Sequence, residues 1–184
     1  MNQKPLIVGL TGRLHSGKTV LAKHLESNGY KRRSFASIIK EVLSIIGFPH
    51  WSLYGSAEDK ARIVPEFGVS GRYACQTLGT EWGRDMISPD IWTRSLFINR
   101  PKDEYTVIDD LRFPNELLAI HERGGVAIGI RRSAAQQVAE SHQSELLVDG
   151  LEVDAWLENE STLEDLQLNL EQTLNTVWEI RKAA

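Results

Sequence analysis

The sequence has a single cysteine and no long apolar run. Cys75 cannot form a disulfide within a chain of 184 residues that holds no second cysteine, so we expect a protein of a reducing compartment, the cytoplasm. No apolar stretch is long enough for a membrane-spanning helix, and the first residues lack the pattern of a secretory signal. The sequence thus argues against a disulfide-stapled secreted domain and against a protein embedded in a membrane.

An excess of positive charge is absent as well. The 21 Lys and Arg residues face 25 Asp and Glu residues, which gives a formal net charge of −4. A chain with this balance has no overall field to hold a nucleic-acid duplex, so we expect no polymeric nucleic acid as a partner. No repeat or linker divides the chain, and we expect a single domain over residues 1–184.

Short apolar runs alternate with helical patterns along the chain. Unalternating apolar runs are typical of strands buried on both faces, and the segments between these runs place apolar residues at helical spacing. Strands separated by helices predict an α/β fold with a parallel sheet of about five strands flanked by helices. We expect strands at residues 6–10, 105–108, 126–130 and 151–157.

Residues 35–100 show helical patterns without a strand signal, and we interpret them as a helical insertion. Within this stretch, Ser56 and Asp59 fit a capping box, and Ser88 before Pro89 fits the start of a helix. Cys75 is expected to be a small core residue.

The sequence GRLHSGKT at residues 12–19 matches the phosphate-loop pattern G-x-x-x-x-G-K-[ST] in full. Glycines let successive backbone N–H groups face an oxyanion, and the following helix presents its positive end to the same phosphates. We expect Lys18 to reach the β and γ oxygens of a nucleoside triphosphate and the Thr19 hydroxyl to hold Mg²⁺. The residues expected to bind ATP here are Gly12, His15, Ser16, Gly17, Lys18, Thr19 and Val20.

A phosphate loop also needs an acidic group at the end of a neighbouring strand. Asp109 and Asp110 directly follow the expected strand at residues 105–108. We favour Asp109 as the group near Mg²⁺, because it is the first residue past the strand. The sequence leaves the choice between the two carboxylates open.

Several classes of protein use a phosphate loop. A GTPase normally carries an Asn-Lys-x-Asp guanine reader, and the chain contains no Asn-Lys pair. Larger ATPases usually need more chain for their moving arms. A compact kinase remains, whose acceptor phosphate is held by arginines because their planar fork meets phosphate bidentately.

Three segments resemble the phage-type deoxynucleoside monophosphate kinases, a branch of the P-loop kinases. They are QTLGTEWGR at residues 76–84, PDIW at residues 89–92 and VIDDLRFPNE at residues 107–116. The segments SFA at 34–36, HQSE at 142–145 and STL at 161–163 resemble the same family, so that the likeness runs from Leu6 to about Leu166.

The resemblance implies transfer of the ATP γ-phosphoryl group to a deoxynucleoside monophosphate (dNMP), with Mg²⁺. It implies catalytic roles for Lys18, Arg84, Arg131 and Asp109, and a lid at about residues 131–149. By the same likeness, Arg131 with Arg132 holds the ATP phosphates, and Asn159 and Thr162 meet adenine. The implied acceptor-binding residues are Phe35, Lys40, Arg72, Gln76, Arg84, Trp92, Asp109 and Arg112.

Some alternatives stay open at this point. Trp92 fits either a core position or a base-stacking position, whereas Trp82 is expected in the core. The chain could also be another small-molecule kinase, acting on dephospho-coenzyme A or on a nucleoside, or a nucleotide-dependent switch. The accepted base, the selectivity for deoxyribose and the formation of a homodimer are left open.

Overall fold

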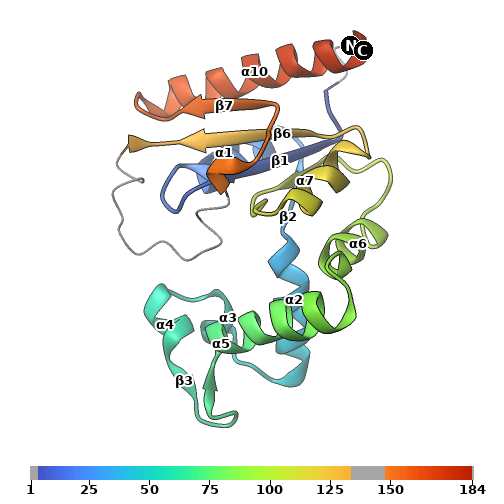
Figure 1. Cartoon of the computed structure of the whole chain (residues 1–184). Coiled ribbons are helices and arrows are strands. Elements are labelled where there is room, and N and C mark those ends of the chain that lie inside the picture. Colours follow the sequence, from blue (N-terminus) through green and yellow to red (C-terminus); the bar gives the residue numbers. More distant parts are fainter. Residues whose placement is uncertain (1–3, 134–147, 184) are drawn as a thin grey trace. The chain divides into compact units, whose positions relative to one another are not determined.

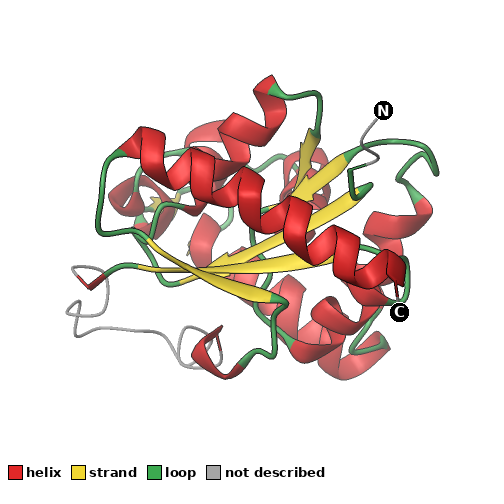
Figure 2. Cartoon of the chain, turned by 90° about the horizontal axis from the view of Figure 1, so that it is seen from above, coloured by secondary structure: helices red, strands yellow, loops and turns green. Residues whose placement is uncertain are grey.

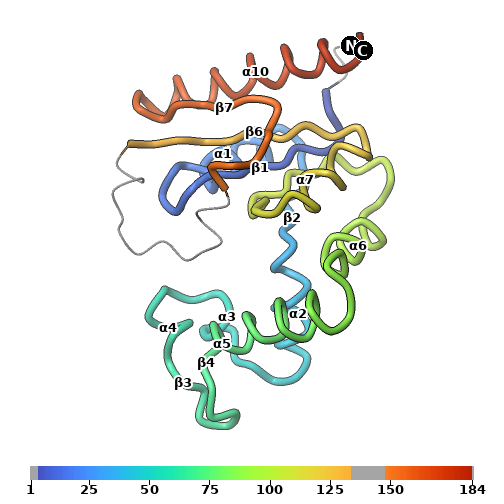
Figure 3. Tube along the Cα trace, viewed as in Figure 1, coloured from blue at the N-terminus to red at the C-terminus, as the bar shows by residue number. Residues whose placement is uncertain are grey.

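The computed structural model describes residues 4–133 and 148–183, and in it the chain divides into two compact units. One unit comprises Met1–Arg33 together with Pro101–Ala184, and the other comprises Ser34–Arg100 (Figures 1 and 3). The second unit covers nearly the same residues as the expected helical insertion. Most of the expected lid, including the HQSE segment, lies outside the described residues.

The first unit contains the parallel sheet of five strands that the sequence predicted, in the order β2-β5-β1-β6-β7. The central strand β1 pairs with β5 and with β6, both in parallel. The residues that follow these three strands therefore meet at one edge of the sheet. The bounds are β1 Ile7–Gly12, β2 Lys31–Arg33, β5 Thr106–Ile108, β6 Val126–Arg131 and β7 Ala155–Glu158.

Helices cover both faces of this sheet. Helices α1 (Lys18–Ser27) and α10 (Leu163–Ala183) lie on one face, and Figure 2 shows the long α10 crossing the strands. Val8 and Leu10 of β1 point into the core beneath them. Helix α7 (Pro114–His121) covers the other face, where a Cβ on Gly9 would lie 2.7 Å from the Ile120 Cδ1 atom.

The sequence did not predict β2, and the strand predicted at residues 151–157 starts four residues before β7 starts and ends one residue before β7 ends. The three residues of β2 are Lys31, Arg32 and Arg33, which carry no apolar periodicity. They form an edge strand in which Arg32 and Arg33 pair with acids instead of entering the core: Arg33 Nε lies 2.7 Å from Glu104 Oε1. A strand of this kind depends on the acidic residues that pair with it, so the pattern of apolar residues along the chain does not predict it.

The second unit is mainly helical, but the expectation that it contains no strand was wrong. Strands β3 and β4 form a short antiparallel hairpin, and runs of two residues are too short to show a periodic signal. The elements are α2 Phe35–Ile46, α3 His50–Tyr54, α4 Ala57–Ala61, β3 Ile63–Val64, β4 Val69–Ser70, α5 Gly71–Gln76, the π-helix η1 Thr77–Ile87 and α6 Ile91–Ile98.

Two helix starts were predicted in this unit. The capping box is confirmed, since Ser56 Oγ accepts the Asp59 N–H and Asp59 Oδ2 accepts the Ser56 N–H. The start at Ser88 was wrong, because α6 begins at Ile91 with Asp90 as its cap. The Ser88 N–H instead donates to the Gly83 carbonyl at 2.9 Å and closes η1.

One half-buried carboxylate joins three elements of the first unit. Asp154, just before β7, accepts two hydrogen bonds on Oδ1 from Arg181, at 3.0 and 2.7 Å. Its Oδ2 accepts the Ala127 N–H of β6 at 2.7 Å and lies 3.1 Å from His121 Nε2 of α7. The end of α10 is thereby tied to the sheet and to the helix on its other face.

We predict that Asp154→Ala lowers the free energy of unfolding by about 2–3 kcal/mol, because it leaves the Arg181 guanidinium and the Ala127 N–H without their charged acceptor. Urea unfolding followed by circular dichroism measures the change. The matched control is Glu122→Ala, which removes an exposed carboxylate and should change stability by less than about 0.5 kcal/mol. An Asp154→Ala midpoint equal to that of the parent would contradict the role of this cluster.

Candidate active site

The phosphate loop lies at the carboxyl end of β1 and leads directly into α1. Gly12 and Gly17 both have positive φ, at 147° and 111°. A Cβ on Gly12 would lie 2.4 Å from the Ile130 carbonyl oxygen, and one on Gly17 would lie 2.7 Å from Asn159 Nδ2. Both the backbone conformation and the lack of space thus require glycine at these two positions.

Lys18, the first residue of α1, has its ammonium group folded over the loop. Its Nζ donates to the carbonyl oxygens of Gly12 and Arg13, at 2.5 and 2.6 Å. The first turn of α1 leaves backbone N–H groups without helical partners at the same place. The loop therefore joins a cation and a set of N–H donors, the combination that binds phosphate.

His15 stands at the tip of the loop with φ at 63°, the only positive φ of a non-glycine residue in the described ranges 4–133 and 148–183. This left-handed conformation costs a non-glycine residue roughly 1–2 kcal/mol. The side chain is exposed. Since such strain is concentrated at functional sites, the observation favours His15 as part of the phosphate-binding backbone.

The C-terminal segment supports the loop from the side. Asn159 donates from Nδ2 to the Ser16 carbonyl oxygen at 2.8 Å. Thr162 caps α10, because its Oγ1 accepts the Asp165 N–H at 3.2 Å, and hydrogen bonds from Ser161 and Thr162 lower the pKa of the Asp165 carboxyl group. The structure thus gives Asn159 and Thr162 structural contacts, while their contact with adenine stays a prediction.

A salt bridge connects the loop to the last residue of the expected lid. Arg13 Nη2 lies 2.5 Å from Asp149 Oδ2, and Arg13 Nε donates to the same oxygen at 3.0 Å. Asp149 belongs to the 3₁₀ turn η2 (Val148–Gly150). The sequence predicts no pairing of these two residues, since two charges 136 positions apart show no pattern.

Asp109 lies at the edge of the sheet, directly after β5. The pairing of Gly9 with Ile108 sets it one strand away from the start of the loop. Its Oδ2 accepts two hydrogen bonds from Arg32 of β2, through Nε at 2.8 Å and through Nη2. Neither bond involves Oδ1, so one carboxylate oxygen is left for another partner.

The turn after Asp110 is fixed by a buried acid that the sequence analysis did not assign. Glu116 is only 2% exposed, and its Oε2 accepts the N–H groups of Arg112 and Phe113 at 2.9 and 3.1 Å. Arg112 is therefore held through its backbone. The signal that could have shown this was Pro114 at the start of the helix with an acid, Glu116, in its first turn.

Arg131, at the end of β6, stacks on an aromatic ring. Its guanidinium carbon lies 4.0 Å from the centre of the Trp156 ring. Gly129 makes room for that ring, because a Cβ there would lie 2.3 Å from Trp156 Cε3. The stack orients Arg131, whereas the neighbouring Arg132 is exposed.

The aromatic candidates of the second unit are buried. Phe35 and Trp92 are 3% and 4% exposed. Trp92 Nε1 donates to the Gly79 carbonyl at 2.7 Å, and its ring fills the space beside Gly83. The Trp92 ring therefore packs against η1, and this geometry does not support the stacking of a base on it. The expectation that Trp82 belongs to the core was wrong, since it is 43% exposed.

The polar candidates of this unit lie on α2 and on the helix formed by α5 and η1. Lys40 Nζ lies 5.0 Å from the centre of the Tyr54 ring. Arg72 and Gln76 are exposed, and Arg84 is half-buried. Cys75 is also half-buried, and burial raises the pKa of its thiol against the lowering effect of the nearby Lys40 and Lys60 ammonium groups.

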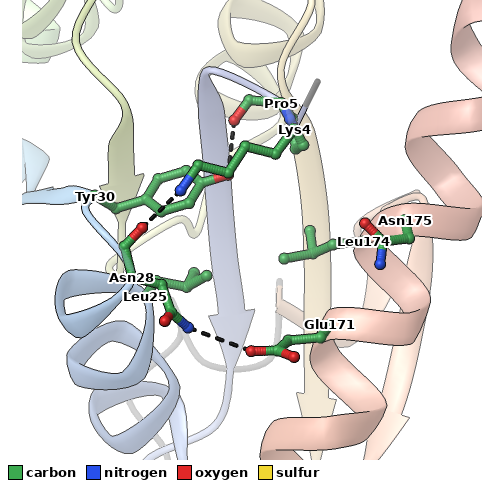
Figure 4. A pocket seen from close by; sticks show the side chains of 8 residues that line it. All are labelled: Lys4, Pro5, Leu25, Asn28, Tyr30, Glu171, Leu174 and Asn175. Atoms are coloured by element: carbon green, nitrogen blue, oxygen red, sulfur yellow. Dashed lines mark hydrogen bonds between the residues drawn. The ribbon is translucent and has the colours of Figure 1, made fainter. Parts of the chain in front are cut away.

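A cavity of about 390 Å³ lies at the opposite, amino ends of β1 and β2 (Figure 4). Lys4 donates to the Asn28 carbonyl at 2.6 Å across it, and Asn28 Nδ2 donates to Glu171 at 3.3 Å. Ligands of open α/β sheets bind at the carboxyl ends of the strands. We therefore do not assign this cavity to the site around the phosphate loop.

The described ranges contain no candidate for a metal cluster or for a membrane-spanning helix. No three His, Cys, Asp or Glu side chains among residues 4–133 and 148–183 lie close enough together to hold a metal ion. In the same part of the chain, no helix has the length and apolar character needed to cross a bilayer.

Comparisons with known proteins point to one family. A model of the deoxynucleotide monophosphate kinase family matches residues 56–170. A protein of Acanthamoeba polyphaga mimivirus named "Putative deoxynucleotide monophosphate kinase" is 31% identical over 180 residues, which cover 87% of this chain and 91% of the viral protein.

Solved structures share the fold at lower identity. TT1252 from Thermus thermophilus is 18% identical with a TM-score of 0.51, and covers 95% of this chain and 98% of its own. The dephospho-CoA kinase from Campylobacter jejuni is 14% identical with a TM-score of 0.52, and covers 97% of this chain and 98% of its own. At these identities the likeness shows the fold alone.

The packing of Trp92 can be tested against the base-stacking role that the sequence left open. We predict that Trp92→Phe lowers the free energy of unfolding by about 1–3 kcal/mol, because the Gly79 carbonyl loses its donor and the smaller ring leaves a void. Urea unfolding measures the stability, and Trp82→Phe is the control at an exposed ring. A parent-like stability combined with a raised KM for a nucleoside monophosphate would instead support base stacking.

Proposed function

We propose, from the premise that the chain belongs to the deoxynucleotide monophosphate kinase family, that it transfers the γ-phosphoryl group of ATP to a dNMP and yields dNDP and ADP. Membership makes the chain a kinase, a phosphotransferase that acts on nucleotides. The observation that carries the proposal is the formed phosphate loop of residues 12–19, with Lys18 bent over it at the start of α1.

The donor half of the reaction is assigned to the first unit. The loop N–H groups and Lys18 bind the β and γ phosphates of ATP, and Lys18 leaves its two carbonyl contacts to do so. Arg131, oriented by Trp156, neutralises charge on the transferring group. Because the acceptor is already an anionic phosphate, the reaction depends on positioning and charge neutralisation more than on a general base.

Mg²⁺ is the metal that this chemistry implies, and the residues fit it. The Thr19 hydroxyl is exposed beside the loop, and Asp109 has one carboxylate oxygen outside its pair with Arg32; Asp110 follows directly. Mg²⁺ usually takes one or two protein oxygens and completes its shell with water and substrate phosphates. When bound, it would offset the negative charge that develops on the phosphates.

The acceptor half is assigned to polar side chains of the second unit. Arg84 is the proposed phosphate ligand, with Lys40 and Arg72 as further cations, and Gln76 is proposed to meet the base or sugar. Arg112 of the first unit is the remaining candidate. Arg72, Gln76, Arg84 and Arg112 all fall within the segment that the family model matches.

We predict that ADP release from ATP with Mg²⁺ depends on an added dNMP, and that Lys18→Ala lowers this turnover by at least about 100-fold because the transferring charge loses its cation. A coupled assay across deoxy- and ribonucleoside monophosphates, with dephospho-coenzyme A and nucleosides as further acceptors, measures it. Lys23→Ala, an exposed lysine of the same helix, should keep parent activity. ADP release confined to dephospho-coenzyme A or a nucleoside, or indifferent to every acceptor, would refute the proposal.

We further predict that Arg84→Ala raises the KM for the dNMP about 10- to 100-fold, because it removes charge-assisted hydrogen bonds to the acceptor phosphate. The KM for ATP should stay within about twofold of the parent value. Arg94→Ala, at an exposed arginine of α6, is the matched control and should change neither constant. A loss confined to the ATP KM would show that Arg84 belongs to the donor side.

A further inference from the structure

We infer that the acceptor nucleotide lies along a straight row of four polar side chains on the helix of residues 71–87, and that Thr80, which no other observation singles out, contacts it. This inference rests on the proposed function and deepens it. The row consists of Arg72, Gln76, Thr80 and Arg84, each four positions from the next.

The row is straight because the helix changes type within it. Helix α5 continues without a break into η1, since Gln76 and Thr77 at the junction both keep helical backbone angles. In an α-helix a step of four residues overshoots one turn by about 40°. In a π-helix, whose i→i+5 bonds widen the turn, the same step falls short. The rotation of every fourth residue about the helix axis thus has opposite signs in the two helix types, and the two rotations compensate along the row.

The buried side of the helix bears out this register. Gly71, Cys75, Gly79 and Gly83 are also spaced by four, and all are buried or half-buried. A Cβ on Gly71 would lie 2.1 Å from the Ser52 carbonyl oxygen, one on Gly79 would lie 2.9 Å from Ile39 Cδ1, and one on Gly83 would lie 2.5 Å from Trp92 Cζ2. This line of small residues thus faces α3, α2 and α6 in turn. In a pure α-helix the same residues would rotate progressively away from these neighbours.

The polar row is next to this buried line, one position further along the chain. Arg72, Gln76 and Thr80 are exposed, and Arg84 is half-buried. The side chains of Gln76 and Thr80 make no hydrogen bond with any residue in the described part of the chain, while Arg72 donates to the Ala57 carbonyl at 3.2 Å. The row therefore presents an unengaged amide and hydroxyl between two guanidinium groups.

The chemistry of the row matches a nucleoside monophosphate. A guanidinium suits the phosphate, whereas an amide and a hydroxyl both donate and accept, as the polar edges of a base and a sugar hydroxyl require. The next line of the helix is acidic and exposed, with Glu81 and Asp85. These acids repel an anionic ligand and so direct it to the side of the helix that carries Arg84. Thr80 is the neutral residue nearest to that arginine along the row.

The test compares Thr80→Val, which removes the hydroxyl at nearly constant volume, with Thr80→Ser, which retains it. Calorimetric titration of the whole chain with the dNMP preferred in the acceptor assay, without ATP, should show a Kd about 3- to 10-fold higher for Thr80→Val. The Thr80→Ser variant should stay within about twofold of the parent. The KM for the dNMP should follow the Kd, and the KM for ATP should not change.

The matched control is Thr176→Val, the same substitution at an exposed threonine of α10, which should bind the dNMP as the parent does. A Thr80→Val protein that keeps parent affinity, while the parent turns over the dNMP, would overturn the inference and leave the proposed function standing. A parent that neither turns over nor binds any dNMP would overturn both. An unchanged Kd with a lowered unfolding midpoint would assign Thr80 to stability alone and also overturn it.

Discussion

The parallel pairing of β1 with β5 and with β6 is the constraint on which the site in the first unit depends. Parallel strands end on the same side of a sheet, so this pairing gathers the residues that follow each of them. The phosphate loop begins at Gly12 of β1, Asp109 follows β5, and Arg131 ends β6. More than 90 residues separate Gly12 from either charged group along the chain, and the pairing of the strands brings these residues to the same side of the sheet.

Glycine at points of close approach is the second condition on which the structure depends. Gly12 and Gly17 allow the loop to curl, and Gly129 accepts the ring that orients Arg131. In the second unit Gly79 and Gly83 admit Ile39 and Trp92 against the π-helix. In each place a Cβ would collide with a neighbour, so close packing and the position of a functional side chain have the same cause.

Several features of the fold were readable from residue patterns because their causes are local. A buried run and a glycine-bearing loop that leads into a helix each leave a periodic or positional mark, which is why β1, the loop and α1 were predicted. The edge strand β2 and the two-residue strands β3 and β4 left no such mark. Trp92, whose environment the sequence left open, is buried, and Trp82, expected in the core, is exposed, because burial of an aromatic ring depends on which helix packs beside it and not on the ring itself.

By itself, the sequence determined the chemistry of the phosphate loop, the alternation of buried strands with helices, and, by resemblance, the family. These depend on residue type and on spacing along the chain, and both are visible without coordinates. Only the tertiary structure decided that Arg32 holds Asp109, that Asn159 holds the loop, and that Asp154 joins three elements. It also decided the π-register that aligns residues 72, 76, 80 and 84. Contacts between distant residues and a change in helical turn arise from packing, and packing is a property of the folded chain.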